Sequence, residues 1–499
     1  MRRRCVIIGS GLGGLSCGVI LAMNGYDVTI LEQGSQVGGC LQCFTRRGTK
    51  FETGMHFIGS ADEDQTLYKL LHYLGVAETI ELHRLNTNGY NVVSLNGDTF
   101  NFANGKEPFI EQMSSYFPAE KDNIVKYYEL IEKIASASSL HSLRHAESDI
   151  AINTEYQLRS INSVLEQMIN DPLLQSVLVG DLPLYAAEKD KTPFSIHAFI
   201  MDFYNKSAFR VVGGSDHIAK SLKDSIEKLG GSVVTNCKVE KIVCNDSCAI
   251  GVIAHDNKFI PADIVISDTH PSITLDLLDS KLIRPAFRKR IIGMKNTISG
   301  FTVYLRFKKD SVKYLNSNFY KYNSNTPWGC ETYDEESWPK GYLYMHMCHQ
   351  KNPQFAESGC ILSYMSMSDV SKWACSTIGH RDECYEQFKQ SKAQKLIAEL
   401  IKDFPELAGK IENYYTASPL TYRDYTGTYG GSLYGIAKDI TLGISNRIPH
   451  KTKIPNVLQT GQNINSHGIL GVLVGSIVTC SELLSSELIY KQITGINGQ

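Results

Sequence analysis

The chain has no excess of charge of either sign. Its 499 residues include 50 basic and 52 acidic side chains, which gives a formal net charge of −2. Nucleic-acid-binding proteins usually carry a basic surplus, so nucleic acid is not an expected partner. Hydrophobic residues make up 42% of the chain, a share typical of globular proteins that excludes the disordered and fibrous classes. A chain of this length holds about three domain lengths at roughly 100–200 residues each.

Long hydrophobic runs are also missing. Residues 5–23 are largely apolar and follow three arginines, but five glycines interrupt them. A membrane-spanning helix needs about 20 predominantly apolar residues, so neither a span nor a signal peptide is predicted. The 13 cysteines are odd in number and scattered along the chain. A secreted disulfide framework is short and dense in cysteine, so the expected location is cytoplasmic.

The first fifty residues carry an ordered glycine pattern between two apolar segments. Residues 4–8 are rich in β-branched side chains, which predicts a buried parallel strand. Gly9, Gly11 and Gly14 follow with the spacing G-x-G-x-x-G, and a helix over 15–24 and a second strand over 26–31 come next. In such a unit the glycines allow a tight turn, close approach of a pyrophosphate, and close packing of the helix on the strand. The segment is therefore predicted to bind a dinucleotide, either NAD or FAD.

Two further features bear on the nucleotide. Glu32 stands 18 residues after Gly14, where an acid accepts hydrogen bonds from an adenosine ribose. Near the other end, a strand over 454–461, a polar loop and an apolar helix over 469–484 form a second strand–loop–helix unit. A helix N-terminus in this setting is an anion site. The two ends together favour FAD as the cofactor.

Several segments identify a family resemblance. MRRRCVIIGSGLGGLSCG, GGCLQCF, FETGMHFIG, PLTYRDYTGT and LQTGQNINSHGILGVL resemble the retinol saturase branch of the carotenoid (phytoene) desaturase family. The resemblance is dense at both ends and thin between residues 62 and 210. It implies an α/β fold: a glutathione-reductase-like FAD-binding Rossmann domain with an interleaved substrate domain built on a mixed β-sheet. The chain departs from many relatives at Cys40, where they carry a basic residue, and at Asn463, where they often carry an acid.

The resemblance also implies which residues contact FAD. The glycine pair after Glu32 passes near the cofactor, the backbone around Val239 reaches the adenine, and the final apolar helix points at the N1/C2=O edge of the flavin. The expected cofactor contacts are Gly9, Gly11, Gly13, Gly14, Glu32, Gln33, Gly38, Gly39, Cys40, His56, Val239, Gly461, Gln462, Asn463, Gly468, Ile469 and Leu470.

The middle of the chain divides between two interleaved domains. The FAD-binding domain is expected to comprise residues 1–60, 210–270 and 440–490, and the substrate domain residues 61–209 and 271–439. Helices are predicted over 64–75, 121–137, 155–169, 385–404 and from about 215 to 229. Strands over 298–307, 342–349 and 360–367 are predicted to form a second, mixed sheet.

Cys40 and Cys43 form a C-x-x-C pair beside the expected flavin. Flavin disulfide reductases carry such a pair, but with four intervening residues and with a second G-x-G-x-x-G for a nicotinamide cofactor, which this chain lacks. A redox dithiol is therefore not expected. No metal site is predicted either, because neither a second C-x-x-C nor a spaced histidine pair accompanies the cysteines.

Three residues are candidates for catalysis. The resemblance places His56 close to the flavin, and it places Tyr422 and Arg423 in a segment that lines the substrate cavity. The alternatives are a histidine with a purely structural role and a polar turn with ordinary surface tyrosines. His467 precedes the last helix, where it either faces the flavin or caps the helix.

The chemistry follows from the cofactor. A flavin exchanges a hydride at N5 without a protein nucleophile. The resemblance implies an FAD-dependent oxidoreductase that saturates or desaturates a C=C bond of a hydrophobic, retinoid- or carotenoid-like polyene or isoprenoid. The alternatives are a flavin amine oxidase and a non-enzymatic isoprenoid-binding chaperone of the same fold.

The expected partners are a hydrophobic small molecule and an unidentified electron donor or acceptor. A long hydrophobic substrate partitions into bilayers, so peripheral contact with a membrane surface is expected, with residues 62–210 as the candidate region. The alternative is an enzyme that works wholly in solution on a small polar amine.

Overall fold

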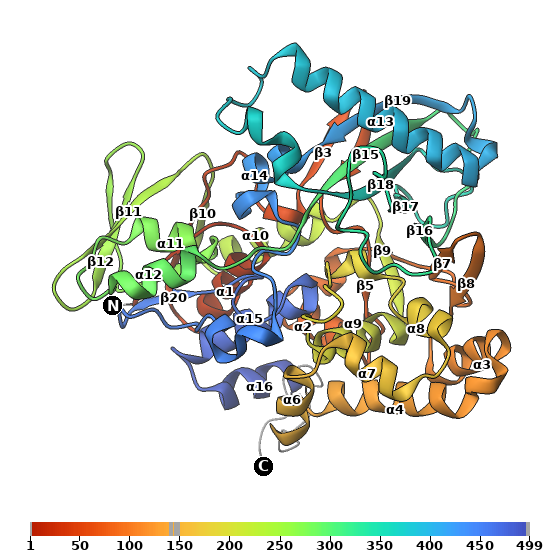
Figure 1. Ribbon diagram of the computed structural model, residues 1–499. Coiled ribbons are helices and arrows are strands. Elements are labelled where there is room, and N and C mark those ends of the chain that lie inside the picture. Colours follow the sequence, from red (N-terminus) through yellow and green to blue (C-terminus); the bar gives the residue numbers. More distant parts are fainter. Residues whose placement is uncertain (1, 139–142, 144–149, 496–499) are drawn as a thin grey trace.

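The computed structural model describes residues 2–138, 143 and 150–495 (Figure 1). The first layer of the fold is a parallel sheet of five strands. The strand order is β10-β2-β1-β14-β20, and every pairing is parallel. Except in the edge strand β10, buried apolar side chains predominate in these strands, as a parallel sheet covered by helices requires. The strands are β1 (Arg4–Ile8), β2 (Asp27–Leu31), β10 (Ser232–Val234), β14 (Ile264–Ser267) and β20 (Val457–Gln459).

Three helices pack against this sheet: α1 (Leu12–Met23), α10 (Asp216–Lys228) and α15 (Gly468–Ser481). α1 begins three residues earlier than predicted, directly at the glycine loop. A Cβ on Gly18 of α1 would lie 2.8 Å from Ile30 of β2 and 2.9 Å from Ile226 of α10. Glycine at this position therefore allows α1 to approach the sheet closely, which brings its N-terminus to the carboxyl ends of the strands.

The second layer is the predicted mixed sheet, now seen to have seven strands in the order β19-β15-β18-β17-β16-β7-β8. The β16–β7 pairing is parallel and the others are antiparallel. Three of these strands match the predicted ones, and four were not predicted. The strands are β7 (Asn91–Leu95), β8 (Asp98–Phe102), β15 (Ser299–Phe307), β16 (Asn318–Tyr322), β17 (Gly341–His346), β18 (Ser358–Met365) and β19 (Ile411–Ala417).

The two faces of the mixed sheet meet different helices. Along β15, Val303 and Leu305 pack with α13 (Glu383–Asp403), while Tyr304 points to the opposite face. That opposite face meets an inserted helical region. Its helices are α2 (Thr66–Tyr73), α3 (Lys106–Tyr116), α4 (Lys121–Ser136), α6 (Ile150–Gln157), α7 (Ile161–Met168), α8 (Pro172–Leu178) and α9 (Phe194–Lys206).

The single helix predicted over residues 155–169 is wrong. The chain instead ends α6 at Gln157 and begins α7 at Ile161. Ser160 adopts an extended backbone and its side chain accepts the N–H of Ser163, which is the geometry of a helix N-cap. A new helix therefore starts at Ser160.

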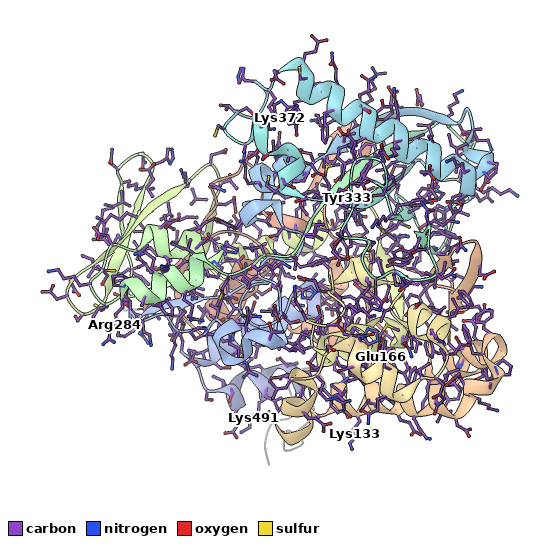
Figure 2. All side chains as sticks on the ribbon, viewed as in Figure 1. Lys133, Glu166, Arg284, Tyr333, Lys372 and Lys491 are labelled. Atoms are coloured by element: carbon purple, nitrogen blue, oxygen red, sulfur yellow. The ribbon has the colours of Figure 1, made fainter. Side chains whose placement is uncertain are left out.

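Smaller elements complete the fold. Short sheets are formed by β3 (Cys43–Arg46) with β4 (Thr49–Glu52), by β5 (Ile58–Gly59), β9 (Ala208–Val211) and β6 (Leu82–Arg84), and by β11 (Val239–Cys244), β12 (Ala249–Ala254) and β13 (Phe259–Pro261). The remaining α-helices are α11 (Pro271–Leu277), α12 (Pro285–Ile292), α14 (Pro419–Thr426) and α16 (Ser486–Thr494). Charged side chains such as Lys133, Arg284 and Lys491 lie at the periphery (Figure 2).

Strands of the parallel sheet come from three separate stretches of sequence, and the mixed sheet draws its strands from the stretches between them. The residue boundaries given above for the two domains stay a prediction. In the part of the chain that the structure describes, no helix combines the length and the apolar character that crossing a membrane requires.

Candidate active site

The glycine loop joins β1 to α1 at the carboxyl end of the parallel sheet. Gly9 has a φ of +96°, which L side chains rarely adopt. A Cβ on Gly14 would lie 2.3 Å from the carbonyl oxygen of Gly9, so the loop closes on itself only with glycine there. Gly11, the N-cap residue of α1, has no side chain to cap the helix, and no acidic residue stands in the first turn. The backbone N–H groups of this turn fit a diphosphate.

Glu32 ends β2 beside the glycine loop. Its Oε2 accepts hydrogen bonds from the backbone N–H (2.9 Å) and the hydroxyl (2.7 Å) of Ser10, and its Oε1 accepts from Gly34 N (2.7 Å). Each carboxylate oxygen has more than one lone pair, so the oriented group can also accept from ribose hydroxyls. The Cys237 N–H donates to the carbonyl oxygen of Glu32 (2.8 Å), which places the strand that contains Val239 close by.

The second glycine pair lies against the first. The Gly38 N–H donates to the carbonyl oxygen of Ser10 (2.8 Å), and a Cβ on Gly39 would lie 3.3 Å from the Cα of Gly11. Gly39 and Cys40 begin a short 3-10 turn, η1 (Gly39–Leu41). Gln33 follows Glu32, and its side chain reaches the end of α14. A Cβ on Gly427, the C-cap residue of α14, would lie 3.7 Å from the Nε2 of Gln33. The structure thus brings together the predicted contacts of the first fifty residues.

Asp268 is a site residue that the sequence analysis missed. It follows β14 directly, and a Cβ on Gly11, Gly13 or Gly461 would lie 2.5, 2.5 or 2.4 Å from its carboxylate oxygens. The carboxyl group therefore stands between the glycine loop and the C-terminal unit. Among the described residues its buried Oδ2 has no partner at hydrogen-bonding geometry, although the Gly11 and Gly14 N–H groups lie close enough to influence the carboxyl. Burial raises the pKa of Asp268 to about 7, against the opposite influence of the Gly14 and Gly11 backbone N–H groups. The sequence signal that could have identified Asp268 is its position directly after a predicted strand, where a side chain reaches the carboxyl end of the sheet.

The C-terminal unit reaches the same crevice. Gly461 has a φ of +93° after β20, and Gly468 has a φ of +74° where α15 begins. The side-chain Oδ1 of Asn463 accepts the Ile436 N–H (2.9 Å), so it holds a neighbouring loop. Ile469 is buried in the first turn of α15, whereas Leu470 is partly buried. Gln462 lies between Gly461 and Asn463 in the connecting loop.

His467 precedes α15, but its side chain makes no capping hydrogen bond, so the capping alternative is wrong. Its Nε2 is buried without a partner among the described residues, and its ring centroid is 4.8 Å from that of Tyr434. Burial lowers the pKa of His467 to about 3, so the imidazole is neutral at pH 7. An unpartnered neutral ring nitrogen at a helix N-terminus offers an acceptor or a donor to a bound group.

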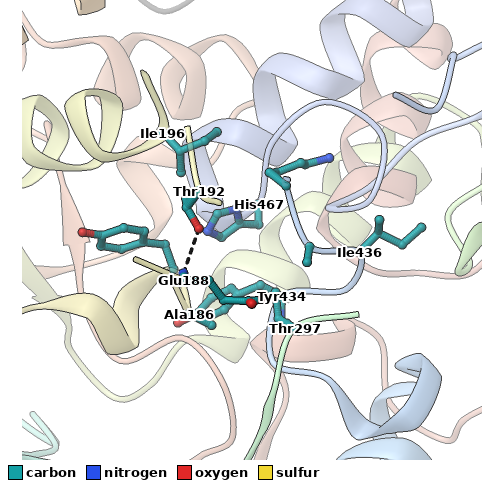
Figure 3. A pocket seen from close by; sticks show the side chains of 11 residues that line it. Ala186, Glu188, Thr192, Ile196, Thr297, Tyr434, Ile436 and His467 are labelled. Carbon is teal, nitrogen blue, oxygen red and sulfur yellow. Dashed lines mark hydrogen bonds between the residues drawn. The ribbon is translucent and has the colours of Figure 1, made fainter. Parts of the chain in front are cut away.

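A pocket opens in front of this helix start (Figure 3). Lys438 lies on its wall and donates to the carbonyl oxygen of Asn463 (3.3 Å). Burial lowers the pKa of Lys438 to about 8, so most of it is still charged at pH 7. The lining residues are Tyr185, Ala186, Glu188, Thr192, Ile196, Thr297, Tyr434, Ile436, Ala437, Lys438 and His467.

The three catalytic candidates have different surroundings. His56 is buried, and its Nδ1 lies 3.5 Å from Glu52 Oε2, too far for a hydrogen bond. The Tyr422 hydroxyl is buried and hydrogen-bonded to Thr302 Oγ1 (2.5 Å), and burial raises its pKa to about 12. Arg423 instead donates to the Ala374 carbonyl (2.7 Å) and to Asp424 (2.8 Å). The geometry therefore gives Arg423 structural partners, and the catalytic roles of all three stay predictions.

Cys40 and Cys43 are both free thiols. Burial raises the pKa of Cys40 to about 11 and that of Cys43 to about 12, and the Cys43 Sγ lies 3.5 Å from Ser215 Oγ. Because the thiolate is the reactive form, neither residue is prepared for thiol–disulfide exchange at neutral pH. That the pair is not a redox dithiol stays a prediction.

A Cys43→Ser variant is expected to keep its flavin and to turn over substrate within a few-fold of the wild-type rate, because serine also hydrogen-bonds to Ser215. Steady-state kinetics with the flavin content measured beside them checks this. Cys40→Ser is the matched control at the other thiol. A loss of several orders of magnitude in turnover with the flavin still bound would restore the disulfide-reductase interpretation.

These residues fit FAD: a glycine cradle around Gly11, against which the Asp268 carboxyl stands, an oriented Glu32 beside it, and an unpartnered His467 at a helix N-terminus. Among solved structures, an oxidoreductase from Methanosarcina mazei is similar with a TM-score of 0.64 and 14% identity, covering 96% of this chain and all of that one. Wild-type putrescine oxidase bound to putrescine has a TM-score of 0.62 and 14% identity, covering 97% of this chain and 99% of that one. These likenesses confirm the predicted fold class.

Sequence relatives cover nearly the whole chain. All-trans-retinol 13,14-reductase of Rattus norvegicus is 27% identical over 97% of this chain and 86% of that protein. The Homo sapiens protein of the same name is 26% identical over 99% of this chain and 87% of that protein. Chloroplastic prolycopene isomerase of Daucus carota is 23% identical over 98% of this chain and 80% of that protein. The resemblance to the carotenoid desaturase and retinol saturase family is thus confirmed.

A family profile completes the identification. The profile described as flavin containing amine oxidoreductase matches residues 12–373. The match confirms that the protein is an FAD-dependent oxidoreductase and removes the interpretation as a non-enzymatic chaperone. With the cradle, the sheet topology and the profile in agreement, the chain belongs to the flavin containing amine oxidoreductase family.

Proposed function

We propose that this oxidoreductase saturates or desaturates a C=C bond of a hydrophobic polyene or isoprenoid of the retinoid or carotenoid kind. The observation that carries the proposal is the likeness to retinol 13,14-reductases over 97% or more of the chain.

When bound, FAD supplies hydride exchange at N5, and the chain supplies orientation and electrostatics. The N-terminus of α15 carries partial positive charge, and Lys438 adds a cation on the wall of the same pocket. Both stabilise negative charge that arises there. His467 is neutral and adds no competing charge. The direction of the reaction stays open, because hydride transfer is reversible.

A flavin amine oxidase is the second candidate, and the observation that favours it is the family description itself. Anaerobic incubation of the holoprotein, in separate photoreduced and oxidised samples, with retinoids, carotenoids and amines distinguishes the two. We expect a polyene to reoxidise the flavin and to gain two mass units. Reduction of the oxidised flavin by amines, with no polyene reacting in either direction, would replace the proposal with amine oxidation.

The proposal extends to the partners and the place of action. An unidentified donor or acceptor exchanges electrons with the flavin, and the protein touches a membrane surface to collect its substrate. Among the described residues of the candidate region 62–210, one large hydrophobic side chain is exposed, that of Leu158 (57% exposed). Elsewhere, Tyr425 (60%) and Tyr429 (45%) are exposed at the end of α14, with Lys372 on the adjoining segment 367–373.

Flotation with anionic liposomes tests the membrane contact. We expect the wild type to float with the vesicles and a Tyr425→Ser/Tyr429→Ser double variant to float less, because exposed aromatic rings anchor at the lipid headgroups. Leu158→Ser is the matched control within residues 62–210. If the control rather than the double variant loses flotation, the contact lies in residues 62–210. Wild-type protein that stays at the bottom with every lipid composition contradicts the membrane contact.

A further inference from the structure

A short stretch around α12 carries positive charge and no negative charge. Residues 281–295, with the sequence KLIRPAFRKRIIGMK, hold six basic side chains and no acidic one, although the whole chain has a formal net charge of −2. α12 lies beside α11 at the edge of the molecule (Figure 1), and Arg284 lies at the same edge (Figure 2). A local surplus of this size on a chain of balanced charge indicates a surface for an anionic partner.

Three of these cations face solvent without a counterion. The side chains of Lys281, Arg284 and Lys289 are exposed, and none of them forms an ion pair with a described residue. Arg284 is the N-cap residue of α12, but its side chain makes no capping hydrogen bond. The charges are therefore not needed to hold the fold together.

The acidic side chains that precede the stretch have other partners. Asp276 lies 3.8 Å from Arg288, which is half-buried and also donates to the carbonyl oxygen of Leu278 (2.8 Å). Asp279 lies 3.3 Å from Lys241 of β11. The positive charge on the outer side of α12 is thus left without local neutralisation.

α12 presents apolar surface on the same side as its charge. Phe287 and Ile291 turn inwards and pack in the core beside the parallel sheet. Lys289 and Ile292 stand three residues apart, so they are neighbours on the outward side of the helix. Ile292 is 40% exposed, and Leu282, just before the helix, is 37% exposed. Exposed aliphatic side chains among unpaired cations are typical of segments that lie in the headgroup region of a bilayer.

The charged stretch ends at the rim of the pocket in front of α15. Lys295 Nζ lies 2.6 Å from Glu188 Oε1, and the Lys295 carbonyl accepts the Ala437 N–H (2.9 Å). Glu188 and Ala437 both line the pocket, as does Thr297. Ile292 stands only three residues before Lys295. A bilayer that contacts Ile292 therefore lies close to the pocket.

We propose that α12 and the segment before it form a docking face for anionic lipids. The cations lie at the lipid headgroups and the two aliphatic side chains lie just below them. Nucleic acid offers the charge but no apolar layer for these side chains. The inference rests on the membrane contact of the proposed function, to which it adds an electrostatic surface and a lipid class. The docking face consists of Lys281, Leu282, Arg284, Lys289 and Ile292.

Binding of the holoprotein to two kinds of vesicle tests the docking face. One kind is phosphatidylcholine alone, and the other is equal parts of phosphatidylcholine and phosphatidylserine. We expect the wild type to bind the anionic vesicles more tightly. Raising the salt from about 0.15 M to about 1 M is expected to remove the difference, because the Debye length falls from about 8 Å to about 3 Å.

Neutralising the three cations is expected to remove most of the preference. Each basic residue near an anionic bilayer strengthens binding about fivefold. Lys281→Gln/Arg284→Gln/Lys289→Gln is therefore expected to bind anionic vesicles about a hundredfold more weakly than the wild type. We expect it to bind phosphatidylcholine vesicles as the wild type does.

A matched triple variant separates the docking face from net charge. Lys308→Gln/Lys309→Gln/Lys313→Gln removes the same charge from exposed lysines between β15 and β16, and it is expected to bind both kinds of vesicle as the wild type does. Leu282→Ser/Ile292→Ser is expected to bind anionic vesicles more weakly and to keep the dependence on salt. Unchanged melting temperature and flavin content show that each variant is folded.

The outcomes separate this inference from the proposed function. Equal binding of the two triple variants, or of the wild type to both kinds of vesicle, overturns the docking face and leaves the membrane contact standing. If Leu282→Ser/Ile292→Ser binds anionic vesicles as tightly as the wild type, the face recognises charge alone, which overturns lipid docking in favour of a soluble polyanion.

The reaction is judged independently in detergent micelles. If the wild type binds neither kind of vesicle but a polyene in micelles reoxidises the flavin, the docking face and the membrane contact fail and the proposed reaction stands. If only amines react, the proposed reaction fails, and the vesicle measurements still decide the docking face.

Discussion

Gly11→Val is expected to abolish FAD binding and to leave most of the fold intact. A Cβ on Gly11 would already lie 2.5 Å from Asp268 Oδ2, and the branches of valine would fill the space in front of the first turn of α1. That turn supplies the N–H groups for the diphosphate. Loss of two charge-assisted hydrogen bonds weakens binding by at least about a hundredfold. Flavin absorbance per protein after gel filtration, and titration of the apoprotein with FAD, measure the effect.

Gly89→Val is the matched control for this prediction. A Cβ on Gly89 would meet Asn101 at 3.5 Å and Asn86 at 3.6 Å, which are ordinary contact distances, and Gly89 is far along the chain from the glycine loop. The control is expected to bind FAD as the wild type does. Far-ultraviolet circular dichroism and the melting temperature show whether each variant is folded. Folded Gly11→Val protein with stoichiometric FAD contradicts the placement of the diphosphate at this loop.

Local sequence determined the elements whose contacts are short in range. The prediction of β1 over residues 4–8 matches the structure, and the glycine spacing that follows is meaningful only at the strand–helix turn where Gly9 has a positive φ. By contrast, β7 and β16 pair in parallel although more than 200 residues separate them. Neither strand carries a local signal for that partner, and four of the seven strands of the mixed sheet were not predicted from the pattern of single segments.

The site shows the same division. Residues of the glycine loop were found because their spacing is a property of one segment. Asp268 was missed because its importance arises only when β14 pairs between β1 and β20, which brings it against Gly11 and Gly461. Lys438 and Tyr434 belong to an irregular loop that Asn463 holds in place through Ile436. A contact of that kind leaves no periodic mark in the sequence.

The FAD affinity of the wild type is expected to fall as the pH rises from about 6 to 9, because Asp268 ionises beside the diphosphate. Its carboxyl has a pKa of about 7, and the charge of Glu32 contributes to raising it. The neutral acid tolerates a bound diphosphate, whereas the carboxylate repels it. Affinity therefore decreases by up to about tenfold per pH unit above the pKa. Cys40 has a pKa of about 11 and stays neutral over this range.

Asp268→Asn tests this dependence, because the amide has the same shape and does not ionise. We expect the variant to bind FAD at least as tightly as the wild type at pH 6, more tightly at pH 9, and with a flat profile between, in titrations of the apoprotein.

The stability of the apoprotein gives an independent measurement. Between pH 3.8 and about 7, the folded protein keeps the Asp268 carboxyl protonated, whereas the unfolded chain has lost that proton. The free energy of unfolding therefore falls as the pH rises through this range. Asp268→Asn should remove that decline. A wild-type FAD affinity that does not change between pH 6 and 9, or an identical slope in the variant, would show that Asp268 does not face the diphosphate.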